Sequence, residues 1–450
     1  MREGKRPKNP DRDGERLFGT DGIRGRWGCF PLDNSSLIRL GVVLQEVLGK
    51  KTGSRILMGA DPRESSPEIR DILSRAEGYS DCGVISTPGL SFLTRQQAFD
   101  YGLMITASHN PYGDNGIKVF NYRGEKASSQ LEEEIQEQFD RQPDIPTPAP
   151  PPRLPEVSPE PYIRFLTEAG QDIAHAPLKV VIDCANGAVS RIAPRVFRRL
   201  GIRNIPIFHH PDGRNINRGC GSEHPAALAA RTCRERADLG IAFDGDGDRL
   251  LLVDPRGRRI DGDRILYILT RYLAVSSEPV CGVVGTVMSN FGLEKALRRL
   301  KIKLYRAPVG DKNVYALLRE KGLVLGGEPS GHIIDTRFQP TGDGVLSALL
   351  FIKALIKLGI DPEAAVAEFA QTPQKSVSIR VKKRIPLQDW PELQGILQDF
   401  QYHHGTDSRA LVRYSGTEPK IRIMLESDRP EVIDRYLPRL VKVVEKQIGE

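Results

Sequence analysis

The stretch LGIAFDGDGDRLLLV, residues 239–253, places three carboxylates directly after a short apolar run. Leu239 to Phe243 has the pattern of a buried central strand in an α/β sheet. Asp244, Asp246 and Asp248 follow at every second position, and the glycines between them let the chain bend tightly. Side chains at every second position of extended backbone point to one side, so we expect the three carboxylates to converge.

Three converging carboxylates require a cation. At about 4 Å and an effective dielectric near 20, each like-charge pair costs about 4 kcal/mol. Oxygen ligands without His or Cys favour Mg²⁺ or Ca²⁺. A calcium loop of the EF-hand type is excluded, because Arg249 and the apolar Leu250 to Val253 occupy the rest of such a loop. A solvated acidic turn without a metal is the alternative interpretation.

Strands and helices alternate with short connections on both sides of this stretch, which predicts α/β units. The expected strands are 178–183, 204–208, 239–243, 281–287, 303–308 and 323–325, and the expected helices are 192–200, 226–237, 293–300 and 313–321. From about residue 375 the pattern changes to antiparallel strands over 376–381, 410–413 and 421–425, followed by a helix from Pro430. The last block is therefore predicted to be α+β.

Length and composition indicate an ordinary globular protein of several domains. The chain has 450 residues, of which 39% are hydrophobic and 27% charged, with a net charge of +7 that does not require a nucleic-acid partner. Six cysteines show neither a C-x-x-C pair nor a disulfide framework, which favours reduced thiols and a cytoplasmic protein. The apolar run Val345 to Leu358 is too short for a bilayer span and predicts a buried helix, so we expect no membrane association.

A second constellation, Thr106-Ala107-Ser108-His109-Asn110-Pro111, follows the apolar run Tyr101 to Ile105. A serine at a strand end, on a loop broken by Pro111, is expected to be exposed enough to act as a nucleophile. No G-x-S-x-G motif surrounds Ser108, and His109 would point to the opposite side in extended backbone, so a serine hydrolase is disfavoured. The alternative is that Ser108 only caps a turn.

Two further loops carry groups suited to phosphate and sugar. Residues 413–419, RYSGTEP, together with Arg422 combine guanidinium groups, hydroxyls and a glycine turn, as a phosphate site requires. Residues 326–332, GGEPSGH, offer a carboxylate, a hydroxyl and an imidazole that suit vicinal sugar hydroxyls. A plain hairpin turn and a structural turn are the respective alternatives.

These four loops, TASHNP, DGDGDR, GEPSGH and RYSGTEPKIR, occur in an order that resembles the α-D-phosphohexomutase superfamily. The segments FGTDGIRG at 18–25, NPY with DNGIK at 110–118, and NIN before CGS at 215–222 look most like the bacterial phosphoglucosamine mutases. The likeness covers nearly the whole chain from Phe18. Any one motif could arise by chance, but four in order at the family's spacing could hardly do so.

The resemblance implies three consecutive mixed-sheet α/β domains plus a C-terminal α+β domain around a central active-site cleft. A proline-rich segment separates the first domain from the rest, because nine prolines favour extended chain. The expected divisions are a flexible tail 1–17, domain 1 at 18–142, a linker 143–161, domain 2 at 162–255, domain 3 at 256–372 and domain 4 at 373–450.

The resemblance also implies roles for individual residues. Ser108 would carry the phosphoryl group and, with Asp244, Asp246 and Asp248, surround Mg²⁺. Lys118 and Arg249 would stabilise the transfer, and Arg24 and His332 would assist near the reacting hydroxyl. The sugar hydroxyls would contact Glu328 and Ser330. The residues expected to hold the non-reacting phosphate are Arg413, Ser415, Gly416, Thr417 and Arg422.

By the same resemblance the chain would interconvert glucosamine 6-phosphate and glucosamine 1-phosphate, with glucosamine 1,6-bisphosphate as intermediate and activator. Its partners would be small phosphosugars, and a homodimer is one assembly that the resemblance allows. A phosphomannomutase or phosphoglucomutase, a metal-dependent phosphatase and a non-catalytic sugar-phosphate binding protein are the rival interpretations. Intact Ser108 and all three aspartates argue against a binding protein.

One segment departs from the family pattern. Asp61-Pro62-Arg63-Glu64-Ser65-Ser66 resembles a family loop in which glycine usually stands in place of Ser66. The stretch from Pro67 to Ser86 is several residues shorter than in family members, so we expect its helix and short strand to be trimmed. The catalytic loops lie outside this stretch.

Overall fold

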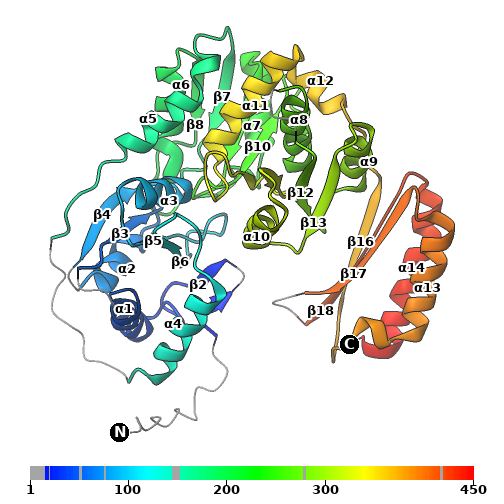
Figure 1. Ribbon diagram of the computed structural model, residues 1–450, viewed down its shortest axis with the longest axis horizontal. Coiled ribbons are helices and arrows are strands. Elements are labelled where there is room, and N and C mark those ends of the chain that lie inside the picture. The colour runs from blue at the N-terminus through cyan, green and yellow to red at the C-terminus, as the bar shows by residue number, and fades with distance from the viewer. Residues whose placement is uncertain are drawn as a thin grey trace.

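The computed structural model describes residues 16–19, 21–49, 53–75, 78–143, 153–276, 280–415 and 419–449. In these ranges the chain forms four sheets of six, five, four and three strands, one after another along the sequence. Figure 1 shows the four units arranged in an arc, from the blue first domain to the red fourth domain. The three mixed α/β units and the final α+β unit confirm the predicted fold class.

The first domain is built on a mixed sheet in which β3 pairs in parallel with β4 and β5, and antiparallel β6 continues the sheet. Its strands are β1 Phe18–Gly19, β2 Gly22–Arg26, β3 Ile56–Ala60, β4 Tyr79–Val84, β5 Tyr101–Ile105 and β6 Asp114–Asn121. Its helices are α1 Asn34–Leu48, α2 Ser66–Leu73, α3 Thr87–Gln96 and α4 Ser129–Arg141. The shortened stretch after Pro67 therefore still contains both a helix, α2, and a strand, β4, which pairs with β3.

The second domain continues the same plan. Its sheet has the order β11-β10-β9-β7-β8, with β7 parallel to β8 and β9. The strands are β7 Lys179–Asp183, β8 Arg203–Ile207, β9 Leu239–Phe243, β10 Leu250–Val253 and β11 Arg259–Ile260, and the helices are α5 Glu160–Ala169, α6 Ala193–Arg199 and α7 Ala226–Glu235. The central strand predicted from residues 239–243 is β9, and all five of its residues are buried.

The third domain has parallel strands β12, β13 and β14 with antiparallel β15 at one edge. Its strands are β12 Gly282–Thr286, β13 Lys303–Ala307, β14 Leu325–Gly327 and β15 Ile333–Asp335, and its helices are α8 Gly262–Ala274, α9 Phe291–Arg299, α10 Asp311–Lys321, α11 Gly344–Leu358 and α12 Pro362–Ala367. The apolar run that we predicted to be a buried helix is α11, which begins at the side-chain cap of Asp343 and ends before Gly359.

The fourth domain is an antiparallel sheet with two helices on one face (Figure 1). Its elements are β16 Gln374–Arg380, α13 Pro391–His404, β17 Ser408–Tyr414, β18 Lys420–Ser427 and α14 Pro430–Ile448. Central β18 pairs with both β16 and β17. In Figure 1 the adjoining ends of β17 and β18 point toward the first domain.

One apolar cluster extends through parts of the first three domains, each of which also has a smaller cluster of its own, and the fourth domain has a separate core. One buried cluster runs from Leu57 in β3 to Phe369 after α12, and a different cluster from Ile379 to Ile448 fills the fourth domain. This division joins the first three domains by packing and leaves the fourth to be held by other contacts.

The structure can be compared with three further sequence predictions, which concern the N-terminal tail, the proline-rich linker and a membrane span. Most of the predicted tail and part of the predicted linker lie outside the described residues, but Leu17 is buried and its N–H donates to Gln136 at 2.8 Å, so it belongs to the first domain. Helix α5 starts at Glu160, inside the predicted linker, because Pro161 is tolerated in a first helical turn. Among the described residues, no helix is both long and apolar enough to cross a membrane.

Candidate active site

Three buried carboxylates converge after β9. Oxygen atoms of Asp244, Asp246 and Asp248 lie within 4.8 Å of one another. Our expectation of extended backbone at this point was wrong, because residues 244–248 form a turn in which the Gly247 N–H donates to Asp244 O at 3.1 Å. Gly247 has a φ of +73°, which favours glycine, and this turn rather than strand alternation brings the carboxylates together.

Ser108 lies against this turn although it belongs to the first domain. It follows β5, and its Oγ donates to Asp244 Oδ2 at 2.5 Å. We expected an exposed serine, but Ser108 is only 1% exposed, because the second domain covers its loop. A side chain at Gly245 would meet Ser108 O at 2.6 Å, so the close contact between the two loops requires glycine there. The alternative interpretation, in which the Ser108 hydroxyl only caps its own turn, does not hold, because the hydroxyl donates to Asp244 of the second domain.

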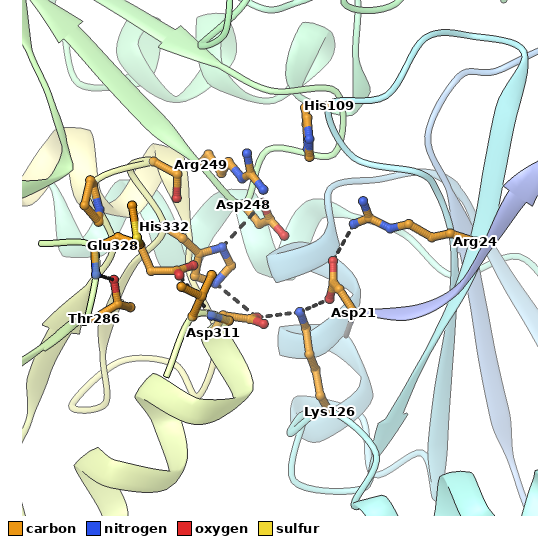
Figure 2. A pocket seen from close by; sticks show the side chains of 15 residues that line it. Asp21, Arg24, His109, Lys126, Asp248, Arg249, Thr286, Asp311, Glu328 and His332 are labelled. Atoms are coloured by element: carbon orange, nitrogen blue, oxygen red, sulfur yellow. Dashed lines mark hydrogen bonds and ion pairs between the residues drawn. The ribbon is translucent and has the colours of Figure 1, made fainter. Parts of the chain in front are cut away.

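His109 does not point away from the site, contrary to the sequence argument. Ser108 has a φ of +52°, so the backbone is left-handed rather than extended at this residue. His109 consequently lines the same cavity as Arg24 and Arg249 (Figure 2). Burial and the two neighbouring guanidinium groups lower the pKa of His109, which favours the neutral imidazole.

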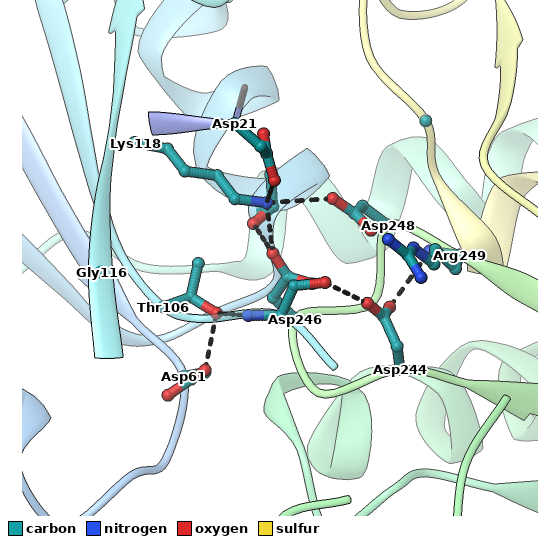
Figure 3. A network of polar contacts seen from close by, with 12 residues as sticks. Asp21, Asp61, Thr106, Gly116, Lys118, Asp244, Asp246, Asp248 and Arg249 are labelled. Atoms are coloured by element: carbon teal, nitrogen blue, oxygen red, sulfur yellow. Dashed lines mark hydrogen bonds and ion pairs between the residues drawn. The ribbon is translucent and has the colours of Figure 1, made fainter. Parts of the chain in front are cut away.

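Lys118 connects the first domain to the acidic turn. Its side chain rises from β6, and Nζ lies 2.8 Å from Asp246 Oδ2 and 3.1 Å from Asp248 Oδ2 (Figure 3). Asp21 adds a third carboxylate at 3.3 Å. Burial would lower the pKa of Lys118, but these three carboxylates outweigh it and hold the pKa well above its usual value. The ammonium group is therefore kept charged inside the protein.

A cavity of about 340 Å³ opens in front of these groups, between the first three domains. Of the residues predicted to act in catalysis or to bind the sugar, five line it: Arg24, Arg249, Glu328, Ser330 and His332. Ser108 and Lys118 do not line it themselves. Ser108 donates to Asp244, and Lys118 pairs with Asp248, which is part of the lining. The structure thus brings the loops from three domains to one place.

His332 is held between two carboxylates. Its Nδ1 lies 3.5 Å from Asp248 Oδ1, and its Nε2 lies 3.3 Å from Asp311 Oδ2. Burial would lower the pKa of His332, but Asp248 and Asp311 raise it to about 10. The imidazole is thus fixed in orientation on the third-domain side of the cavity, as Figure 2 shows.

The sequence analysis missed three charged residues of the cavity. Lys126 pairs with Asp21 of the first domain and with Asp311 of the third domain, and Figure 2 shows it between them. Asp21 lies inside the FGTDGIRG segment and could have been suspected there. Lys126 and Asp311 carry no local signal, because each gains its partner only when the first and third domains meet.

The described residues of the predicted phosphate loop do not line the cavity. Arg413 and Arg422 face each other across β17 and β18, and buried Ser415 follows β17. Gly416 and Thr417 lie outside the described residues. No described residue of the fourth domain lines the cavity, but Arg413 Nη2 lies 3.9 Å from the sulfur of Met288, which does. Arg413 of β17 therefore lies next to the edge of the cavity.

The chemistry of the aspartates fits a hard divalent cation. Asp246 Oδ1 is buried and accepts no hydrogen bond from any described residue, although Asp246 Oδ2 accepts from Lys118. Burial and the two neighbouring aspartates raise the pKa of Asp244 well above its usual range. A cation at the free oxygens would remove this mutual repulsion, and an all-oxygen donor set suits Mg²⁺ or Ca²⁺.

Comparison with known proteins assigns all four domains of the chain to the same family. Residues 15–145, 160–257, 261–372 and 377–443 match, in order, the alpha/beta/alpha domains I, II and III and the C-terminal domain of phosphoglucomutase/phosphomannomutase. The chain is 39% identical to the phosphoglucosamine mutase of Alcanivorax borkumensis, over 96% of this chain and 99% of that protein. It is 40% identical to that of Thermus thermophilus over the same shares.

Solved structures share the fold at low sequence identity. A phosphoglucomutase/phosphomannomutase family protein from Burkholderia thailandensis superimposes with a TM-score of 0.78 at 23% identity, covering 96% of this chain and 99% of that one. The N-acetylphosphoglucosamine mutase of Aspergillus fumigatus, solved with GlcNAc-6P and magnesium, gives 0.67 at 17% identity and covers 97% of both chains. The chain therefore belongs to the phosphoglucomutase/phosphomannomutase family.

Proposed function

We propose that this chain is a phosphoglucosamine mutase, which interconverts glucosamine 6-phosphate and glucosamine 1-phosphate. The observation that carries the chemistry is the 2.5 Å hydrogen bond from Ser108 Oγ to Asp244, which places a hydroxyl of one domain at the acidic turn of another. The amino sugar follows from relatives named phosphoglucosamine mutase at 39–40% identity over nearly the full length. The product would supply UDP-N-acetylglucosamine synthesis.

Ser108 carries the phosphoryl group in this proposal. The bond between phosphorus and Ser108 Oγ breaks as phosphorus bonds to a sugar hydroxyl oxygen, which gives glucosamine 1,6-bisphosphate; the hydroxyl loses its proton, and Ser108 Oγ gains one. The reverse step from the other phosphate regenerates phosphoserine and returns a proton to the sugar oxygen that is released. A phosphoserine brings a charge of about −1.5 to −2 beside Asp244. Mg²⁺ held by Asp244, Asp246, Asp248 and the phosphate would offset that charge when bound.

The surrounding cations and polar groups complete the site. Lys118 and Arg249 stabilise the transferring group, since Lys118 pairs with the acidic turn and Arg249 lines the cavity beside it. Arg24 and His332 face the reacting hydroxyl from opposite domains, and Glu328 and Ser330 contact the other sugar hydroxyls. The non-reacting phosphate is bound by the hairpin residues Arg413, Ser415, Gly416, Thr417 and Arg422. We further propose that the protein acts in the cytoplasm, where its six free cysteines would stay reduced.

The rival functions differ in substrate or in the fate of the phosphoryl group. A phosphomannomutase or phosphoglucomutase would use the same site, and the identity to phosphoglucosamine mutases favours the amino sugar. A metal-dependent phosphatase would pass the phosphoryl group to water. A binding protein would not modify Ser108.

Steady-state assays of the purified protein with glucosamine, glucose and mannose phosphates test the proposal. We expect the highest kcat/KM with the glucosamine phosphates, phosphate on Ser108 by peptide mass spectrometry, and no release of inorganic phosphate. Ser108→Ala should abolish turnover and the phosphopeptide while the protein stays folded. Ser91→Ala is the control, because Ser91 is equally buried in the first domain and donates only to the carbonyl of Gly124. Full turnover by Ser108→Ala would refute the covalent mechanism.

A further inference from the structure

The segment Asp61 to Ser66 lies directly behind the Ser108 loop, and the proposed function assigns it no role. Strands β3 and β5 are parallel neighbours, and Ala60 pairs with Ile105 at their ends. The residues that follow the two strands therefore emerge at the same edge of the sheet. Arg63 is among them, and its side chain is 0% exposed.

Every N–H of the Arg63 guanidinium has an acceptor, and most of these acceptors belong to one loop. Nε donates to Asp61 Oδ2 at 2.9 Å. The other N–H groups, two on each terminal nitrogen, reach the backbone carbonyls of Ser108, Asn110, Pro111 and Asp114. A planar guanidinium can span several carbonyls at once, whereas the three donors of a lysine diverge from a single nitrogen.

The loop that these bonds hold is conformationally strained. Ser108 is left-handed, with a φ of +52°, and a residue with a Cβ pays about 1 to 2 kcal/mol for this conformation. Its own N–H donates to Thr106 Oγ1 at 2.9 Å, and Thr106 donates in turn to Asp61 Oδ2 at 2.6 Å (Figure 3). Asp61 thus supports both Arg63 and the residue that orients Ser108.

The second domain holds the same carbonyls from the other side. Asn217 Nδ2 lies 2.8 Å from Ser108 O and 3.1 Å from Asn110 O. Arg63 Nη2 lies 2.9 Å and 3.0 Å from the same two oxygens. The backbone of Ser108 is therefore clamped between an arginine of its own domain and an asparagine of the domain that carries the aspartates.

We propose that Arg63 is a positioning residue for phosphoryl transfer, which fixes the backbone of residues 108–114 so that Ser108 Oγ meets the acidic turn. Asn217 completes this clamp from the second domain. Arg63 does not line the substrate cavity, so its loss should impair the transfer step and leave substrate binding nearly unchanged. The kinetic part of this inference rests on the proposed function, but the structural part does not.

The test replaces Arg63 by lysine, which keeps the charge beside Asp61 and loses the fork of donors. In hydrogen exchange, we expect the amides of residues 106–117 to exchange at least about tenfold faster, with β3 and α2 unchanged. In steady-state assays with glucosamine 6-phosphate, kcat should fall about 100-fold while KM stays within about threefold.

Arg39→Lys is the matched control. Arg39 is also a buried arginine of the first domain, but its Nη2 donates to the carbonyl of Phe139 in α4 at 2.6 Å, away from the Ser108 loop. This variant should lose thermal stability and keep both kcat and the exchange rates of residues 106–117.

Asn217→Gly tests the clamp independently if Arg63→Lys does not fold. Glycine suits the φ of +58° at this position, so only the side-chain amide is lost. We expect the same exchange change, with kcat lowered about tenfold. Unchanged exchange at residues 106–117 in whichever variant folds, or an unchanged kcat with a raised KM, would overturn the inference. If the wild-type protein lacks mutase activity, the proposed function fails, and the exchange experiment still decides whether Arg63 anchors the loop.

Discussion

The two carboxylate oxygens of Asp246 have different surroundings. Oδ2 accepts hydrogen bonds from Thr87 Oγ1 at 2.6 Å and from Lys118 Nζ at 2.8 Å. Oδ1 is buried and accepts none from the described residues. One oxygen is therefore used to join the two domains, and the other remains for a metal ion.

Asp246→Asn should lower the affinity for Mg²⁺ at least about tenfold, which corresponds to about 1.4 kcal/mol, because the amide removes the charge from the free oxygen. Isothermal titration calorimetry with MgCl₂ measures it. Asp254→Asn is the control, since Asp254 is a fully buried aspartate of the same domain that pairs with Arg258 instead. Equal Mg²⁺ affinity in wild type and Asp246→Asn would show that Asp246 is not a ligand.

At the scale of elements, the β17–β18 hairpin brings two like charges together. The register places Arg413 opposite Arg422. Burial and the nearby Arg422 lower the pKa of Arg413. Cross-strand pairs of like charge destabilise a sheet, so this pair is better explained by an anion that both arginines bind than by the hairpin's own stability.

Arg422→Ala should raise KM for glucosamine 6-phosphate and for glucosamine 1-phosphate alike, because in the proposed mechanism this hairpin binds the non-reacting phosphate in either orientation of the bisphosphate. Charge-assisted contacts of about 1.5 to 3 kcal/mol predict increases of about 10- to 100-fold. Initial-rate assays in both directions measure them, with the exposed Arg439→Ala of α14 as control. A KM change in one direction only, or lost thermal stability with both KM values preserved, would contradict this role.

Helix α8 also supports its neighbour α9 through a buried carboxylate. Asp263 Oδ2 accepts the N–H of Asn290, the residue that caps α9, at 2.7 Å. Burial, with a further contribution from Asp261, raises the pKa of Asp263 to about 7. An aspartate in the unfolded chain has a pKa of about 3.9, so the folded protein binds this proton more tightly. The resulting stabilisation is present below about pH 4 and is lost as the pH rises through 7.

Asp263→Asn should remove this pH-dependent loss of stability, because the amide stays neutral at every pH. Between about pH 5 and pH 8, the unfolding free energy of the wild type should fall by about 3 kcal/mol more than that of the variant. Urea denaturation at both pH values measures the difference. Parallel pH profiles of the two proteins would show that Asp263 does not titrate in this range.

At the scale of the whole molecule, a buried ion pair within the fourth domain contacts the backbone of the third domain. Glu426 of β18 is fully buried, accepts the N–H of Phe291 at 3.0 Å, and pairs with Arg409 at 3.0 Å. Arg409 also donates to the carbonyl of Ser289 at 2.8 Å. Since the apolar cores of the two domains are separate, these polar contacts have a large share in fixing the fourth domain.

Arg409→Met should leave the carboxylate of Glu426 buried without its partner, at a cost of about 3 to 5 kcal/mol. Differential scanning calorimetry should then resolve a transition of the fourth domain below that of the other three. Arg439→Met is the control, because Arg439 pairs with Asp399 on the surface of the fourth domain alone. A single unchanged transition in Arg409→Met would mean that apolar packing is enough to dock this domain.

The sequence by itself determined the type and position of many of the elements, although not of all of them. Apolar runs such as Leu239 to Phe243 and Val345 to Leu358 became β9 and α11, because the periodicity of buried side chains is a local property. The convergence of Asp244, Asp246 and Asp248 was also accessible, since these residues share one short turn, although the turn itself was mistaken for extended chain.

Only the tertiary structure decided which groups meet across domains. Ser108 and Asp244 are 136 residues apart, and the burial of Ser108 follows from a domain that contacts it. Lys126 and Asp311 look like ordinary surface charges in the sequence and become partners, largely shielded from solvent, where the first and third domains meet at the cavity. Propensity and spacing describe interactions along the chain, whereas charge pairing in a cavity depends on distances that the packing of three domains creates.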